Sequence, residues 1–136
     1  MIKKSIGLLI FIFCFFLIYI TKPYSQDEYF KYESADLIDH YFSSLQNGDT
    51  KQLLSMLTGP YKKKRQNLLE NNLQYAEFVR KINADLTFEI VDMNVLDDRK
   101  IAVDIIVTRQ DSIEKLKLIL IREDQILKIY DEQLVP

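Results

Sequence analysis

The sequence is poor in the residues that build metal sites, disulfides and phosphate-binding loops. It has one cysteine, one histidine and three glycines in 136 residues. The cysteine, Cys14, lies in an apolar segment near the amino end, so the rest of the chain has no partner for an intrachain disulfide. His40 is the single histidine, so a zinc site built from cysteine and histidine is excluded. Glycine-rich phosphate loops are also absent, and we expect neither a metal nor a cofactor.

The sequence also has fewer basic than acidic residues. The chain has 18 lysines and arginines against 20 aspartates and glutamates. Without Lys3 and Lys4, which precede the apolar segment, 16 basic residues face 20 acidic ones, and the formal charge is −4. Nucleic-acid binding requires a basic face. We therefore expect no nucleic-acid partner.

A long apolar segment near the amino end is the most informative feature that is present. Residues 6–20 carry no charged side chain and follow directly on a short basic stretch. This pattern predicts a cytoplasmic n-region at 1–5 and a transmembrane anchor or signal h-region at 6–21. The chain would contact the membrane through 6–21, and the remainder would lie outside the cytoplasm.

Two interpretations of this segment stay open. Its length lies between a secretory h-region of about 7–15 residues and a membrane-spanning helix of about 20. No Ala-x-Ala pattern follows it, which favours an uncleaved anchor and a single-pass cell-membrane protein. A cleaved signal would instead give a secreted or periplasmic domain. In both cases the polar stretch 22–33 is interpreted as a tether.

Beyond the tether, apolar residues first recur with a helical period. The first stripe consists of Leu37, Ile38, Tyr41, Phe42 and Leu45. Gly48 suits the left-handed exit from this helix, and either Asp49 or Thr50 suits the cap of a short second helix. A third helical stretch is expected over 61–82, with a kink or an interruption at Asn71 and Asn72 because asparagine is a poor interior helix residue.

From Leu86 onward the apolar period changes to two, which is typical of strands. The alternating residues are Phe88, Ile90, Val103, Ile105, Val107, Leu116, Leu118 and Leu120, and a short fourth strand is expected over 126–130. The short turns predict an antiparallel meander, and a phase change predicts a bulge near Val91 and Asp92. The fold class is therefore α+β, with helices packed on one face of a four-stranded antiparallel sheet over 34–136.

The order of these elements resembles the NTF2-like (cystatin-like α+β cone) superfamily. The residues that carry the likeness are the helix and corner 35–49, ADLIDHYFSSLQNGD, followed by Leu53, Leu54, Met56 and Leu57. The resemblance implies a curved sheet that wraps a long helix and often leaves a pocket between them. Members include small enzymes, ligand binders and non-catalytic modules. A membrane-anchored subset, similar to VirB8-type proteins, shares the layout of one spanning helix and one exported domain.

The resemblance also implies a ligand pocket lined by Tyr41, Tyr75 and Phe88, which would take a small apolar ligand. The alternative is that these aromatic residues belong to the core. We expect no catalytic residue, because His40 lies away from the apolar stripe of its helix and Asp104 alternates away from the helices. A small lyase or isomerase that uses the pocket remains the enzymatic alternative.

Two surface features are further candidate interaction sites. Apolar residues on the sheet face away from the helices suggest an interaction face for a homodimer or an envelope protein partner: Ala102, Ile106, Ile119 and Ile121. The alternative is an ordinary surface that is partly covered by the carboxy-terminal tail. The basic block Lys62, Lys63, Lys64 and Arg65 is interpreted either as a solvated helix start or as a contact with anionic headgroups.

Together these observations predict a membrane-anchored, extracytoplasmic, non-catalytic interaction domain of a bacterial envelope protein. The alternatives are the pocket enzyme and the secreted soluble domain.

Overall fold

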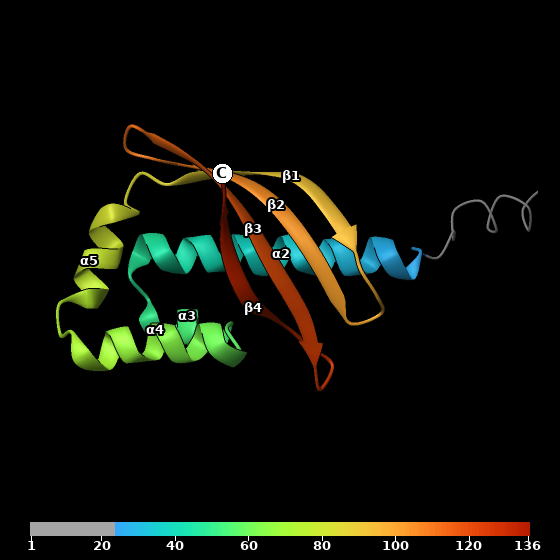
Figure 1. The fold of residues 1–136 in the computed structure, drawn as a ribbon, viewed down its shortest axis with the longest axis horizontal. Coiled ribbons are helices and arrows are strands. Elements are labelled where there is room, and N and C mark those ends of the chain that lie inside the picture. Colours follow the sequence, from blue (N-terminus) through green and yellow to red (C-terminus); the bar gives the residue numbers. More distant parts are fainter. Residues whose placement is uncertain (1–23) are drawn as a thin grey trace, which may run out of the picture.

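The computed structural model describes residues 24–136, so the expected anchor or signal segment at 6–21 lies outside the described residues (Figure 1). The helices are α2 (Gln26–Asn47), α3 (Thr50–Ser55), α4 (Gly59–Asn71) and α5 (Tyr75–Ile82). The strands are β1 (Thr87–Val95), β2 (Lys100–Arg109), β3 (Ser112–Glu123) and β4 (Ile126–Val135). The predicted α+β class is confirmed, with helices first and a curved sheet last. Within residues 24–136, no helix is long and apolar enough to cross a membrane.

The sheet is the predicted antiparallel meander, with strand order β1-β2-β3-β4. Its inner face packs on α2, which crosses behind the strands in Figure 1. The alternating residues Val103, Ile105, Val107, Leu116, Leu118 and Leu120 are all buried. They meet the α2 stripe of Ile38, Tyr41, Phe42 and Leu45, which is also buried. The bulge is confirmed by a register shift between Ile90 and Asp92.

The amino end of the domain differs from the prediction. The expected tether at 22–33 is wrong from Gln26 onward, because α2 begins there and Phe30 is already buried. The reason is a capping box: the Glu28 N–H donates to the Ser25 hydroxyl, and the Ser25 N–H donates to the Glu28 carboxylate. These bonds satisfy two free amide groups and start the helix in a polar stretch. The folded domain therefore includes residues that were assigned to the tether.

The corner between α2 and α3 follows the prediction. Gly48 ends α2 with a φ of +66°, and the Asp49 side chain accepts a hydrogen bond from the Gln52 N–H. A Cβ on Gly48 would lie 2.9 Å from the Cβ of Arg80, so α5 packs directly on this corner. The third helical stretch is interrupted as predicted, by residues 72–74 between α4 and α5.

The last strand is longer than predicted and continues to Val135. A register shift lies opposite Ile119 and Leu120, where Ile119 pairs with Asp131 and Leu120 pairs with Ile129. The extra residue in β4 reverses which of the following side chains face inward and which face outward. As a result Glu132 pairs with Leu118 and shares its inward-facing side.

Candidate functional site

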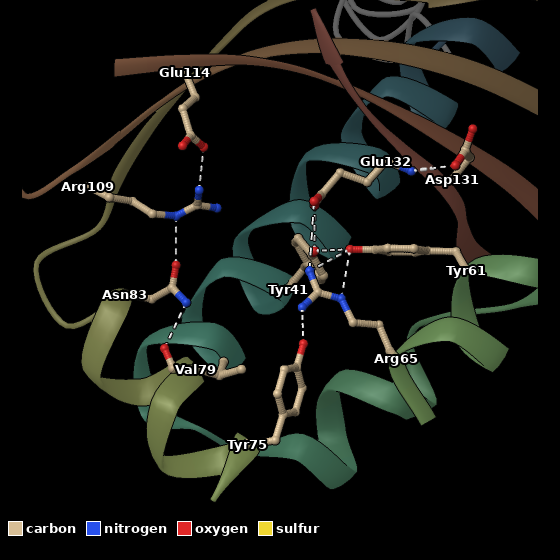
Figure 2. Close-up of polar contacts among 10 residues, drawn as sticks. All are labelled: Tyr41, Tyr61, Arg65, Tyr75, Val79, Asn83, Arg109, Glu114, Asp131 and Glu132. Carbon is tan, nitrogen blue, oxygen red and sulfur yellow. Dashed lines mark hydrogen bonds and ion pairs between the residues drawn. The ribbon is translucent and has the colours of Figure 1, made fainter. Parts of the chain in front are cut away.

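Five side chains from three helices and one strand meet between the sheet and α4 (Figure 2). They are Tyr41 of α2, Tyr61 and Arg65 of α4, Tyr75 at the start of α5, and Glu132 of β4. We call them the tyrosine–arginine cluster. Tyr41 is fully buried, and Tyr61 and Tyr75 are nearly so. The cluster is the largest set of connected polar side chains inside residues 24–136, and we treat it as the candidate site.

A directed chain of hydrogen bonds runs through the cluster. The Tyr41 hydroxyl donates to Glu132 Oε2 at 2.7 Å. An ionised carboxylate can only accept, so the hydrogen of Tyr41 is committed to Glu132. The 2.7 Å bond between the two hydroxyls must then be donated by Tyr61 to Tyr41. Arg65 starts the chain, since its Nε and Nη2 donate to the Tyr61 hydroxyl at 3.2 and 2.9 Å.

Arg65 also joins α5 to the cluster. Its Nη1 donates to the Tyr75 hydroxyl at 2.6 Å, and its guanidinium carbon lies 5.4 Å from the centre of the Tyr61 ring. Its Nη2 is 3.8 Å from Glu132 Oε1, and the two side chains keep only 19% and 18% of their surface exposed. One arginine therefore ties α4 to α2, α5 and β4 at the same time.

Burial and charge hold the cluster in one protonation state at neutral pH. Burial raises the pKa of Tyr61 to about 12, and the nearby Glu132 carboxylate adds to this effect. Burial, again helped by Glu132, raises the pKa of Tyr41 well above its usual value. Burial alone would lower the pKa of Arg65, but the tyrosine oxygens and Glu132 raise it overall. Neutral tyrosines therefore donate hydrogen bonds, and a charged arginine is fixed beside them.

These pKa shifts predict a loss of stability in alkali. An unfolded tyrosine ionises near pH 10, whereas folded Tyr61 keeps its proton to about 12. The folded state therefore binds more protons than the unfolded state over this interval, and stability falls as the pH rises through it. We expect the melting temperature to fall steeply between pH 10 and 12. Replacing Tyr61 with phenylalanine should make the fall shallower, as followed by circular dichroism; equal slopes for the parent and Tyr61→Phe would contradict the assignment.

The predicted pocket residues occupy two different places. Tyr41 and Tyr75 both belong to the cluster and are linked through Arg65. Phe88 lies apart from them and stacks on Phe42, with ring centres 4.5 Å apart. All three pack inside the domain, and the pocket itself stays a prediction.

The basic block does not act as one surface. Lys63 and Lys64 are exposed, but Arg65 turns inward, so its assignment to a membrane contact is wrong. The cause is helical spacing: Arg65 lies four residues after the buried Tyr61 and shares its face of α4. That spacing was the one sequence signal that could have identified Arg65 as an interior residue.

The two groups judged unsuitable for catalysis lie where the sequence placed them. His40 is exposed and its Nδ1 is 2.8 Å from the Asp36 carbonyl oxygen, a contact that raises the pKa of His40. Asp104 lies on the outer sheet face, 3.6 Å from the ammonium group of Lys117. Within residues 24–136, no three histidine, cysteine or carboxylate side chains gather in a way that would hold a metal ion.

Two solved structures have folds that resemble the fold of this chain. An NTF-2 like protein of unknown function from Shewanella oneidensis MR-1 has a TM-score of 0.58 at 11% identity, covering 76% of this chain and 97% of that chain. An NTF2-like protein of unknown function from Cytophaga hutchinsonii ATCC 33406 has a TM-score of 0.44 at 10% identity, covering 75% and 89%. No protein-family model and no curated protein matches the sequence. The likeness to the Shewanella oneidensis protein, with its TM-score of 0.58, shows the NTF2-like fold alone.

Proposed function

We propose that this NTF2-like domain is a non-catalytic binding module, held outside the cytoplasm by a membrane anchor at 6–21, that pairs with a second copy of itself. The pairing surface is the outer face of the sheet, on the side away from α2. The observation that carries the proposal is a group of half-exposed apolar side chains at the centre of that face: Ala102, Ile106, Ile119 and Ile121.

The register of β2 and β3 places Ala102, Ile119 and Ile121 next to one another, and Ile106 lies beyond the Asp104–Lys117 pair on the same face. Ala102 pairs with Ile119 across the two central strands, and Ile121 follows two positions along the same face. A shallow groove of 320 Å³ lies beside Ile106, Lys115 and Val135. Contiguous apolar surface that is rimmed by polar groups marks association sites on soluble domains.

The charges around this apolar centre favour a second copy as the partner. The outward positions carry the acidic residues Glu89, Asp92, Asp104, Glu123 and Asp131 and the basic residues Lys100, Lys115, Lys117 and Lys128. Five negative charges against four positive ones leave the face close to electrical balance. A twofold interface must be self-complementary, and a balanced face meets this requirement better than a face of one sign.

The interior cluster supports a binding role over catalysis. The Tyr41 hydroxyl, the most buried polar group of the cluster, is already bonded to both Tyr61 and Glu132. An acid or base needs a free position within hydrogen-bond reach of its substrate. A lyase or isomerase would have to break these bonds, so the cluster is better suited to holding the helices on the sheet.

The membrane part of the proposal rests on the sequence. The apolar segment, the preceding lysines and the missing cleavage pattern support an uncleaved anchor with its amino terminus in the cytoplasm. The resemblance to VirB8-type proteins supports the same layout. An anchor also favours pairing, because it confines the domains to a surface and raises their effective concentration.

The test is the oligomeric state of the purified full chain in detergent, measured by light scattering during size-exclusion chromatography. The parent should be a dimer. Ile106→Glu and Ile119→Glu should each weaken self-association by about 100-fold, because a carboxylate buried against its own copy loses solvent and faces a like charge. Leu73→Glu is the matched control, since Leu73 is 99% exposed on the opposite part of the fold. A parent monomer, or Ile119→Glu that elutes like the control, would overturn the proposed pairing.

A further inference from the structure

A groove of 620 Å³ lies at the amino end of α2, apart from both the cluster and the outer face. Its walls come from α2 and from the two hairpin turns between β1 and β2 and between β3 and β4. We call it the hairpin groove. The lining residues that matter here are Tyr29, Phe30, Asp98, Arg99, Arg122 and Asp124.

The two arginines of the groove are positioned by the fold. The Arg122 N–H donates to the Arg99 carbonyl oxygen at 2.8 Å. In return the Arg99 side chain donates to the Arg122 carbonyl oxygen from Nε and Nη2, at 3.4 and 3.2 Å. The Arg122 guanidinium lies 4.9 Å from the centre of the Phe30 ring and pairs with Glu33. Arg122 is therefore engaged, whereas the Nη1 group of Arg99 has no acceptor within residues 24–136.

The start of α2 places this groove close to the membrane. The apolar segment ends at residue 21 and α2 begins at Gln26, so four residues connect them. An extended chain covers at most about 3.6 Å per residue, or about 14 Å in all. This step rests on the proposed anchor. A tether over 22–33 would have allowed the domain to lie far from the bilayer. The capping box at Ser25 starts α2 earlier and therefore shortens the connection.

The charges of the groove select among lipid headgroups. Arg99 and Arg122 contribute two positive charges, and Asp98 and Asp124 contribute two negative ones. A purely anionic headgroup would meet the two carboxylates as like charges. A headgroup that carries a phosphate and an ammonium finds a partner for each of its charges. Tyr29 is 56% exposed at the rim, and tyrosine is enriched at the level of lipid headgroups.

We propose that the hairpin groove binds the headgroup of a zwitterionic phospholipid at the outer surface of the membrane. The phosphate lies against the Arg99 side chain, and the ammonium lies between Asp98 and Asp124. Binding there fixes the orientation of the domain, with the amino end of α2 towards the bilayer.

The test uses the full chain in detergent, titrated with phosphatidylethanolamine or with phosphatidylglycerol and followed by native mass spectrometry. The parent should retain phosphatidylethanolamine at least tenfold better than phosphatidylglycerol. Asp124→Asn should lose that preference, and asparagine suits the left-handed conformation of this turn residue, whose φ is 48°. The matched control is Asp111→Asn in the exposed turn between β2 and β3. Arg99→Gln should weaken retention of both lipids, and Lys64→Gln should not.

Several results would overturn the proposal. Equal retention of the two lipids, a preference for phosphatidylglycerol, or an unchanged preference in Asp124→Asn each contradict it. Extraction of cell membranes with alkaline carbonate separates this outcome from a failure of the anchor. Protein that stays in the membrane without lipid selectivity disproves the groove site alone, whereas protein released by carbonate disproves the anchor and with it the placement of the groove at the bilayer.

Discussion

Replacing Arg65 with alanine is expected to lower the free energy of unfolding by about 3 kcal/mol, the cost of removing one partner from a largely buried charged group. The change removes the donors to two tyrosine hydroxyls and leaves Glu132 without its nearest positive charge. For a domain of this size the melting temperature should fall by more than about 10 °C. Thermal unfolding of the purified full chain, followed by circular dichroism, measures the effect.

Lys64→Ala is the matched control for this experiment. Lys64 precedes Arg65 on the same helix but is exposed, so its loss should change stability by less than about 0.5 kcal/mol. Arg65→Lys should fall between the two, because lysine keeps the charge but lacks the planar fork that contacts two tyrosines. If Arg65→Ala and Lys64→Ala melt together, Arg65 does not hold the helices on the sheet.

A second large effect is expected from Phe42→Ala. Phe42 is almost fully buried, stacks on Phe88 and contacts the ring of Tyr41 edge-on, with 5.2 Å between centres. Truncating a buried phenylalanine costs about 3–5 kcal/mol through lost burial and the cavity that remains. Urea titration at constant pH should show a lower midpoint with an unchanged slope.

The same substitution at an exposed phenylalanine provides the comparison. Phe78 is 54% exposed on α5, so Phe78→Ala should move the midpoint little. Equal losses for the two variants would contradict the packing of Phe42 between α2 and the sheet. Comparing the two variants therefore separates the loss of core packing from a general effect of alanine substitution on stability.

The parts of the fold that local patterns determine were predictable from the sequence. Strand residues such as Val103 and Leu118 alternate strictly because one sheet face is buried, and this alternation located the inner face. Gly48 and Asp49 marked a corner because a left-handed exit and a side-chain cap need those residue types. The start of α2 was missed although Ser25 and Glu28 form a recognisable capping box, because the apolar period begins only later.

The candidate site depends on contacts that no local pattern encodes. Tyr41 and Glu132 are 91 residues apart, and they meet because β4 completes the sheet over α2. The strand prediction ended at Tyr130, where the register shift reverses the alternation. Without that shift Glu132 would face outward, so its role became visible only when the register was known. Arg65 was missed for a different reason, since a run of four basic residues suggests a solvated surface.

The inward and outward faces of the sheet thus have separate roles. The inner face carries the core and the tyrosine–arginine cluster, which keep α4 and α5 in place. The outer face remains half exposed and is the surface proposed for pairing, while the hairpin groove lies at the amino end of α2. The proposed binding function depends on pairing through the outer face.

Cysteine cross-linking of the full chain in its native membrane tests this pairing. Cys14 is replaced with serine, and Ile119→Cys or Leu73→Cys is introduced as the single thiol for a short bismaleimide. We expect a covalent dimer, of twice the 16.1 kDa chain mass, from Ile119→Cys and none from Leu73→Cys. No dimer from Ile119→Cys, or equal yields from the two positions, would contradict pairing through the outer face of the sheet.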